Sequence, residues 1–273
     1  MRVAVCLCVK NEERDLVEWL TYQDAIGFNT VITYDNESTD GTSAILHAVS
    51  AVQDVRIVPW ERKDGSPQMD AYRDCLAQFG SEFDWIAFID SDEFIVPGES
   101  SGLIDMLTEL SHHDAVVMPW AMFGSSGYRT RPNGLTIESF TRRASDDFGP
   151  ARHVKSIVRP ASVKDVINPH VFDGAWSTVT PDGATARWEF PGLLAGRPNY
   201  YLTHVNHYFT KSAQQWNEKV RRGYAWCEAR PVREFEEYDR NEVEDLSATR
   251  YVDAVKERMG KVLQSDIYLN PHP

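Results

Sequence analysis

Short apolar runs alternate with helical segments along the first 120 residues of the chain. The runs are rich in β-branched and aromatic residues, which is typical of strands buried on both faces. They cover residues 3–9, 30–34, 55–60, 85–89 and 115–120. Helical spacing fills the intervals, at 12–26, 42–49, 68–79 and 102–110. Asn11 is the expected N-cap of the first helix. The alternation predicts a mostly parallel sheet with helices on both faces, wound like a nucleotide-binding α/β fold.

The pattern changes after Phe123. Turn-forming residues become frequent and separate short strand candidates at 135–141 and 153–158. Loop-rich, partly antiparallel regions of this kind shape substrate pockets over a rigid sheet. Beyond Ser212 the spacing is helical again.

Composition excludes several classes of protein. The chain has 273 residues, of which 42% are hydrophobic and 25% charged, as in soluble globular proteins. A net charge of −13 argues against a nucleic-acid partner. No stretch approaches the roughly 18 apolar residues of a transmembrane helix. The N-terminal apolar run is too short for a signal peptide. The four cysteines lack zinc-ligand spacing and are expected to be buried thiols, which indicates a cytoplasmic location.

Three carboxylates follow the apolar run at 85–89. Asp90, Asp92 and Glu93 stand at the carboxyl end of a strand, where open α/β sheets bind ligands. If the strand continued, Asp90 and Asp92 would point the same way, with Glu93 supporting them. Such oxygen ligands suit Mg²⁺ or Mn²⁺, and such a metal suits a diphosphate. The alternative is a solvated turn that only ends the strand.

A second polar segment spans residues 34–42. Its Asp, Asn, Ser and Gly residues favour a turn and can cap the following helix. Asp35 could also accept the imide hydrogen of a uracil-type base at the edge of the sheet. A calcium loop is excluded, because its glycine would fall at Asp40 and its final glutamate at Leu46.

Together these motifs resemble the GT-A-fold glycosyltransferases, most closely family 92 and bacterial family-2-like relatives. The resemblance runs in the expected order over residues 3–223. It is carried by Lys10-Asn11-Glu12, Glu18-Trp19, Gly27, Tyr34-Asp35-Asn36-x-Ser38-x-Asp40, Asp90-Ser91-Asp92-Glu93-Phe94, Phe123-Gly124-Ser125-Ser126-Gly127, Glu138-x-Phe140, Lys155-Ser156-Ile157-Val158, His170, Asn206-His207-Tyr208, Lys211-Ser212 and Lys219-x-x-Arg222-Gly223.

The resemblance implies transfer of a sugar from a nucleotide diphosphate donor, UDP above all, to a glycan or glycolipid acceptor. It also implies inversion and a need for Mn²⁺ or Mg²⁺. The expected fold is a GT-A-type α/β sheet with three parts: a nucleotide-sugar-binding half at 1–122, an acceptor and catalytic half at 123–211, and a helical extension at 212–273.

The same resemblance assigns roles around the nucleotide and the metal. Asn11, Glu12 and Asp35 would line the pocket for the base and ribose. Asp90 and Asp92, which form a DxD motif, would hold the metal and the ribose side of the donor.

Later residues would complete the donor site. His207 would be the third metal ligand, with a core histidine among aromatic residues as the alternative. Lys155, Lys211 and Arg222 would neutralise the diphosphate, although Lys211 and Arg222 could equally belong to a solvated helix face.

An inverting enzyme also needs a carboxylate that deprotonates the acceptor hydroxyl. Glu138 is the first candidate and Asp173 the second, with an ordinary surface carboxylate as the alternative for each. Two other functions stay open at this point: a sugar-phosphate nucleotidyltransferase and a non-catalytic nucleotide-sugar-binding protein. The first normally has a glycine-rich basic loop after its first strand, where this chain has Lys10-Asn11-Glu12-Glu13.

Overall fold

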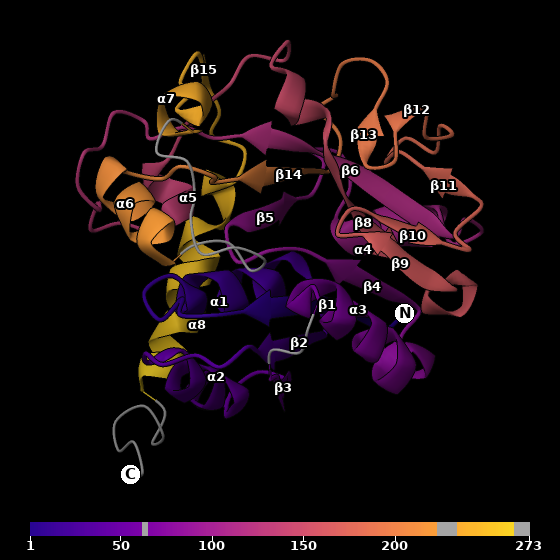
Figure 1. Ribbon diagram of the computed structural model, residues 1–273, viewed down its shortest axis with the longest axis horizontal. Coiled ribbons are helices and arrows are strands. Elements are labelled where there is room, and N and C mark those ends of the chain that lie inside the picture. The colour runs from indigo at the N-terminus through magenta and orange to yellow at the C-terminus, as the bar shows by residue number, and fades with distance from the viewer. Residues whose placement is uncertain (62–64, 223–233, 265–273) are drawn as a thin grey trace.

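The computed structural model describes residues 1–61, 65–222 and 234–264 of the chain (Figure 1). A nine-stranded sheet crosses the described part in the order β3-β2-β1-β4-β8-β6-β14-β5, with β11 beside β6. Its strands are β1 (Val3–Val9), β2 (Thr30–Asp35), β3 (Val55–Pro59), β4 (Trp85–Phe88), β5 (Glu93–Val96), β6 (Ala115–Met122), β8 (Val154–Val158), β11 (Thr178–Val179) and β14 (His204–His207).

The sheet is largely parallel. Strands β1 to β4 run parallel because a helix connects each to the next. β8 runs antiparallel to both β4 and β6, and β5 runs antiparallel to β14. The helices of this half are α1 (Leu16–Ile26), α2 (Thr42–Ser50), α3 (Pro67–Phe79) and α4 (Leu103–Glu109).

Alternate residues of β1 face two different hydrophobic cores. Val3, Val5 and Leu7 pack with buried residues of α1, α2 and α4. Ala4 and Cys6 pack on the other face with residues of α3. Helices therefore cover both faces of the sheet, and the predicted α/β fold class is confirmed.

The second half contains short antiparallel strand pairs, as the sequence predicts. β9 (Asp165–Asn168) pairs with β10 (Val171–Asp173), and β12 (Trp188–Phe190) pairs with β13 (Leu193–Leu194). β7 (Arg142–Arg143) pairs with β15 (Val243–Glu244). Since β8 and β14 lie inside the main sheet, the first two predicted parts share one scaffold.

The C-terminal part contributes α6 (Ala213–Arg222), α7 (Glu234–Tyr238) and α8 (Val252–Leu263). Figure 1 shows α8 crossing beside α1, where Val255 and Val262 are buried in the core that α1 also joins. Arg258 of α8 donates a hydrogen bond to Asp24 of α1. The predicted extension thus packs on the sheet domain, and the three-part division itself stays a prediction.

The strand predicted at 135–141 is wrong. Residues Thr136–Ser139 form one helical turn, α5, because buried Glu18 of α1 binds its first amides. The Glu18 carboxylate accepts hydrogen bonds from the backbone N–H groups of Thr136 (2.8 Å) and Ile137 (3.0 Å). A carboxylate placed at the first N–H groups of a helical turn stabilises it.

The predicted start of the first helix is also wrong. α1 begins at Leu16, and Asn11 adopts a left-handed backbone conformation with φ of 54°. Its side-chain oxygen accepts a hydrogen bond from the backbone N–H of Thr39 at 2.7 Å. Asn11 therefore ties the loop after β1 to the loop after β2 instead of capping α1.

Two predictions from composition can be compared with the described residues. Cys6, Cys8 and Cys75 are free thiols as expected, while Cys227 lies outside the described residues. In the described ranges, no helix combines the length and apolarity needed to cross a membrane.

Glu18 should make stability depend on pH. Burial raises the pKa of Glu18 from 4.5 to about 7, against the opposing hydrogen bonds from Thr136 and Ile137. The folded state therefore holds a proton that the unfolded state loses above its lower pKa, so this contribution is full below pH 4.5 and falls as pH rises through 7. The wild-type free energy of unfolding should therefore fall between pH 5 and pH 8. In Glu18→Gln we expect this fall to be smaller by about 1–3 kcal/mol. Urea unfolding at a series of pH values measures this free energy, and exposed Glu109→Gln is the control. An unchanged pH dependence of the unfolding free energy in Glu18→Gln would contradict the raised pKa of Glu18.

Candidate functional site

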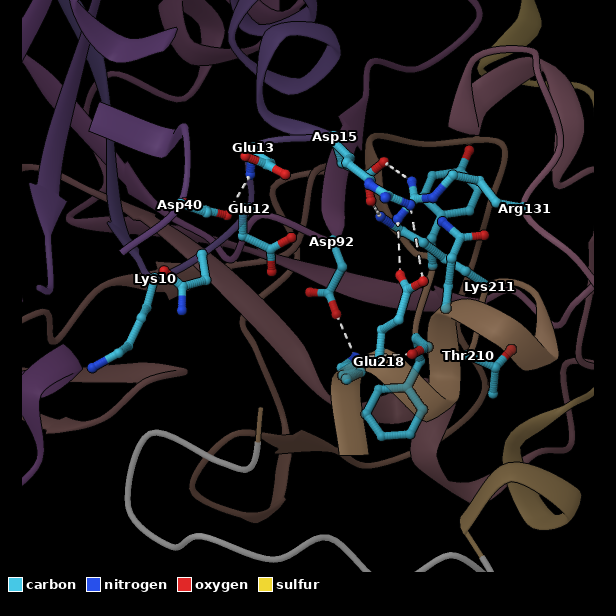
Figure 2. A pocket seen from close by; sticks show the side chains of 16 residues that line it. Lys10, Glu12, Glu13, Asp15, Asp40, Asp92, Arg131, Thr210, Lys211 and Glu218 are labelled. Carbon is cyan, nitrogen blue, oxygen red and sulfur yellow. Dashed lines mark hydrogen bonds and ion pairs between the residues drawn. The ribbon is translucent and has the colours of Figure 1, made fainter. Parts of the chain in front are cut away.

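A cavity of about 430 Å³ lies beside the carboxyl end of β1, between the loop that precedes α1 and helix α6. Figure 2 shows how charged side chains from distant segments converge on it. Its charged lining residues are Lys10, Glu12, Glu13, Arg14, Asp15, Asp40, Asp92, Arg131, Lys211, Glu218 and Lys219. Acidic and basic groups are interleaved, so the cavity suits a ligand that is itself charged.

Asp92 lines this cavity and faces two basic side chains. Its Oδ2 accepts a hydrogen bond from the Lys219 ammonium at 2.6 Å, and its Oδ1 lies 3.5 Å from His207 Nε2. Burial would raise the pKa of Asp92, but Lys219 and His207 outweigh burial and hold the pKa well below its usual range. Asp92 is therefore an anion that is already partly neutralised by α6.

Asp90 has different partners. Lys155 on β8 is fully buried, and its Nζ lies 3.1 Å from Asp90 Oδ2 and 3.4 Å from Glu93 Oε2. Gln68 donates to the other oxygen of Asp90. β4 ends at Phe88, and the chain turns before β5, so Asp90 and Asp92 do not share one direction as a continued strand would require.

Glu93 stabilises this turn through a hydrogen bond to its backbone. Its Oε2 accepts a hydrogen bond from the Asp90 backbone N–H at 2.9 Å. Burial raises the pKa of Glu93 to about 8, against the opposing charge of Lys155. Burial also acts to lower the pKa of Lys155, but Asp90 and Glu93 outweigh it and raise that pKa. The buried ammonium, buried Glu93 and half-buried Asp90 form one charge cluster.

His207 ends β14, where it pairs in register with Glu93. Its Nδ1 lies 3.8 Å from Glu93 Oε1, and neither atom has a hydrogen-bond partner among the described residues. Burial lowers the pKa of His207 despite the nearby charge of Asp92, which favours the neutral ring. The ring also packs against Trp120 and Phe209, with centroids 4.4 Å and 5.2 Å away. His207 thus has the packing of a core residue and also faces Asp92.

A network of ion pairs forms another wall of the cavity (Figure 2). Asp15 Oδ2 lies 2.6 Å from Lys211 Nζ, and Asp15 Oδ1 lies 2.5 Å from Arg131 Nη1. Arg131 also reaches Glu218 at 3.5 Å. Burial would raise the pKa of Asp15, but Lys211 and Arg131 outweigh it and lower the pKa. Lys211 therefore lines the cavity with its charge paired, and its proposed contact with the diphosphate stays a prediction.

The loop after β1 brings two more predicted residues to the cavity, Asn11 and Glu12. Glu12 donates its backbone N–H to Thr42 Oγ1 at 2.8 Å, and its Oε1 accepts a hydrogen bond from Ser91 at 3.1 Å. Asp35 is not among the lining residues of this cavity. Its carboxylate accepts hydrogen bonds from the Ser38 backbone and the Ser43 hydroxyl within its own turn.

Three other predicted residues lie elsewhere. Glu138 is exposed on α5 and forms an ion pair with Lys256 of α8 at 2.9 Å. Asp173 ends β10 and lines a separate, mostly apolar cavity of about 220 Å³. The side chain of Arg222 is outside the described part of the structure.

Sequence reasoning missed Lys219, Arg131 and Asp15 as site residues. Lys219 was visible as the first residue of the Lys219-x-x-Arg222 motif, without a role. Arg131 and Asp15 gave no local signal, because their contact joins residues 116 positions apart. Of the predicted set, the structure brings seven residues to the cavity or to the cluster beside Asp92: Asn11, Glu12, Asp90, Asp92, Lys155, His207 and Lys211.

Comparison with known sequences identifies the family. The profile described as glycosyltransferase family 92 matches residues 1–186, which is more than half of the chain. The chain belongs to glycosyltransferase family 92. This agrees with the resemblance seen in the motifs.

Family 92 relatives are found among plant proteins. One from Oryza sativa subsp. japonica is 31% identical over 178 residues, covering 63% of this chain and 28% of that protein. One from Arabidopsis thaliana is 26% identical over 173 residues, covering 58% of this chain and 28% of that protein. The chain therefore spans less than a third of the length of these relatives. Among solved structures, S. aureus TarS 1-349 is similar at 20% identity and a TM-score of 0.41, over 68% of this chain and 59% of that one.

The charge cluster of Lys155, Glu93 and Asp90 predicts a large stability effect, because Lys155 and Glu93 are buried. Lys155→Met would leave Asp90 and Glu93 facing each other without a cation, which should cost about 3–5 kcal/mol in unfolding free energy. Adding Glu93→Gln should recover part of the loss. Lys256→Met, which removes the exposed pair with Glu138, is the control and should cost less than about 1 kcal/mol. Urea unfolding measures all three, and equal losses in Lys155→Met and Lys256→Met would refute the cluster.

Proposed function

We propose that this chain transfers a sugar from a UDP-type nucleotide donor to a carbohydrate acceptor, with inversion and with a divalent cation. The observation that carries the proposal is that Asp92 and Lys219 line a charged cavity beside the carboxyl ends of β1 and β4, with His207 facing Asp92 from behind the lining. Membership of family 92 supports the class of reaction. Because the chain spans only part of its relatives, the activity is stated as a proposal for this chain.

The cavity offers several cations to a diphosphate. Lys211, Lys219 and Arg131 each hold a carboxylate in the structure, at distances of 2.5–2.6 Å for their shortest pairs. Phosphate oxygens form charge-assisted hydrogen bonds of the same kind and can share these donors. Asn11 and Glu12 lie at the same cavity for the nucleoside, with Asp35 as a further proposed contact to the base.

Within the described ranges, no group of three or more His, Cys, Asp or Glu side chains is arranged to hold a metal ion. Two residues, Asp92 and His207, are nevertheless suited to bind a metal ion. If the proton of His207 lies on Nδ1, toward the unpartnered Glu93 Oε1, the Nε2 lone pair is free to bind a cation together with Asp92 Oδ1, which lies 3.5 Å away. Carboxylates commonly orient metal-binding histidines in this way. Asp92 and His207 would then hold the cation, with oxygens of the diphosphate as further ligands.

Asp90 fits this role less well than the sequence suggests. Both of its oxygens already accept hydrogen bonds, from Gln68 and Lys155. In our proposal Asp90 stays on the ribose side of the donor. A bound Mg²⁺ or Mn²⁺ would stabilise the negative charge that develops on the leaving diphosphate.

The chain's own cations act in the same sense. When the bond to the anomeric carbon breaks, negative charge moves onto the diphosphate. Lys219 is fixed by Asp92 and by the Phe209 carbonyl at 2.8 Å, so its ammonium needs little reorganisation to face that charge. Preorganised charge of this kind lowers the barrier most effectively in a water-poor site.

Metal dependence is the first test. Titration calorimetry should show UDP binding at least about tenfold more weakly in chelator than in Mn²⁺, which corresponds to about 1.4 kcal/mol. His207→Phe keeps ring packing against Trp120 and Phe209 but removes both nitrogens. It should raise the Mn²⁺ concentration needed for UDP binding and leave the melting temperature of the metal-free protein nearly unchanged. Exposed His47→Phe is the control.

Opposite results would redirect the proposal. Equal UDP affinity in chelator and Mn²⁺ would remove the metal. Early melting of His207→Phe with unchanged metal dependence would make His207 a packing residue. A screen of nucleotide sugars for release of free UDP, with and without saccharide acceptors, tests the transfer itself. Binding without any turnover would favour a non-catalytic nucleotide-sugar-binding protein.

The general base is the second test. Glu138 and Asp173 remain our predicted candidates, although neither lines the cavity with Asp92. If one is the base, its variant, Glu138→Gln or Asp173→Asn, should lose transfer at least about a hundredfold while donor affinity is retained. Near-normal turnover in both variants would assign the role to a carboxylate of the cavity, with Glu12→Gln as the next variant to measure.

A further inference from the structure

A group of aromatic and histidine side chains adjoins the carboxylates and has no role in the function proposed so far. Trp120 lies on β6, His153 precedes β8 and His170 precedes β10; these strands lie together in Figure 1. The Trp120 ring stacks on His153 with centroids 5.2 Å apart and meets His170 edge to face at 5.3 Å. Its third neighbour is His207, at 4.4 Å. The group therefore continues directly from the imidazole that faces Asp92.

Backbone carbonyls fix the tautomers of two of these histidines. His153 Nδ1 lies 3.0 Å from the Pro150 carbonyl oxygen, and His170 Nδ1 lies 2.7 Å from that of Val154. A carbonyl oxygen only accepts, so each Nδ1 carries the hydrogen and each Nε2 carries a lone pair. Burial lowers the pKa of His170 to about 3, which keeps its ring neutral. Neither Nε2 has a hydrogen-bond partner within the described part of the protein.

The surrounding backbone holds His170 in place. Its own N–H donates to Asn168 Oδ1 at 2.8 Å, and its carbonyl accepts from the Ser156 hydroxyl at 2.5 Å. Gly192 packs against its side chain so closely that a Cβ there would lie 3.0 Å from the His170 Cβ. The unpaired Nε2 atom of His170 therefore belongs to a ring whose position is fixed by these contacts.

Trp120 adds a donor to these acceptors. Its indole Nε1–H is buried and has no hydrogen-bond partner among the described residues. Buried polar groups in native proteins are nearly always paired, so an unpaired one calls for a water or a ligand. Two fixed acceptors and one donor thus lie on a single group of contacting rings.

We propose that Trp120, His153 and His170 form a subsite that binds the hydroxyl groups of a pyranose ring beside the diphosphate. The inference rests on the proposed function and deepens it. A hydroxyl both donates and accepts, so it can satisfy the imidazole Nε2 atoms as well as the indole N–H. An anion is disfavoured, because two lone pairs would face it.

The position of the subsite agrees with this ligand. Asp90 and Lys155 lie near enough to His170 to act on its charge, and His207 contacts Trp120 while it faces Asp92. A sugar bound here is adjacent to the groups assigned to the diphosphate. It is either the sugar that the donor carries or the sugar that receives it, and both present the same hydroxyl chemistry.

The test uses variants that keep the buried contact and remove the free acceptor. The amide nitrogen of asparagine can take the place of Nδ1, so His170→Asn and His153→Asn retain the bond to the carbonyl and lose Nε2. His170→Gln returns an oxygen near the Nε2 position and should restore part of the binding. Exposed His47→Asn on α2 is the matched control, and melting temperatures verify that each variant folds.

Calorimetry in Mn²⁺ then compares UDP with UDP-glucose, UDP-galactose and UDP-N-acetylglucosamine. For a donor sugar, His170→Asn should weaken the best-bound UDP-sugar about 3- to 10-fold and leave UDP unchanged. Methyl hexopyranosides, titrated by NMR in the presence of UDP, test an acceptor sugar: their binding should weaken by a similar factor while the UDP-sugars are unaffected.

Either result supports the subsite and identifies which sugar occupies it. Unchanged affinity for UDP-sugars and methyl hexopyranosides in both folded asparagine variants would overturn it. Failure of the wild-type chain to bind UDP at all would instead refute the proposed function. In that case the subsite is tested separately, by titrating methyl hexopyranosides without UDP into the wild-type chain and the asparagine variants.

Discussion

One buried ammonium group, that of Lys155, makes the arrangement of carboxylates at the centre of the sheet possible. Asp90, Asp92 and Glu93 lie within four consecutive residues, and their carboxyl groups would repel one another strongly if all three were ionised without a nearby cation. The antiparallel strand β8 enters between β4 and β6 and carries Lys155 to two of them. The third, Asp92, is thereby left to face the cavity.

The charge of Asp92 is balanced by segments that lie far away in the sequence. Lys219 lies on α6, 127 positions after Asp92 in the sequence. His207 is brought close to Asp92 because its strand, β14, pairs with both β5 and β6. Opposite them, the Asp15 network joins α1 to Arg131 and Lys211. The cavity therefore forms only when both halves and helix α6 are in place, so its shape depends on long-range folding.

This division also explains what the sequence could predict. Strands and helices of the first half follow from local apolar spacing, and so does the position of the acidic residues at the end of β4. The segment 135–141 was misassigned because the group that makes it helical, Glu18, lies more than a hundred residues upstream. Likewise, the family resemblance assigned roles to Asp90 and Lys155 but could not show that they bind each other, or that Glu138 lies on the surface with Lys256.

Register explains why the proposed sugar subsite and the carboxylates are neighbours. β14 lies between β6 and β5, with Val205 opposite Trp120 on one side and His207 opposite Glu93 on the other. His207 itself lies between Met122 of β6 and Glu93 of β5, and Trp120 is two residues before Met122. The His207 ring is therefore close enough to contact Trp120 on one side and to face Glu93 on the other. If the subsite holds the sugar of the donor, the donor would meet Trp120 with its sugar and Asp92 with its diphosphate. Because the bond to be broken lies between those two parts of the donor, His207 would stand beside the reacting centre, held there by β-sheet hydrogen bonds and not by a mobile loop.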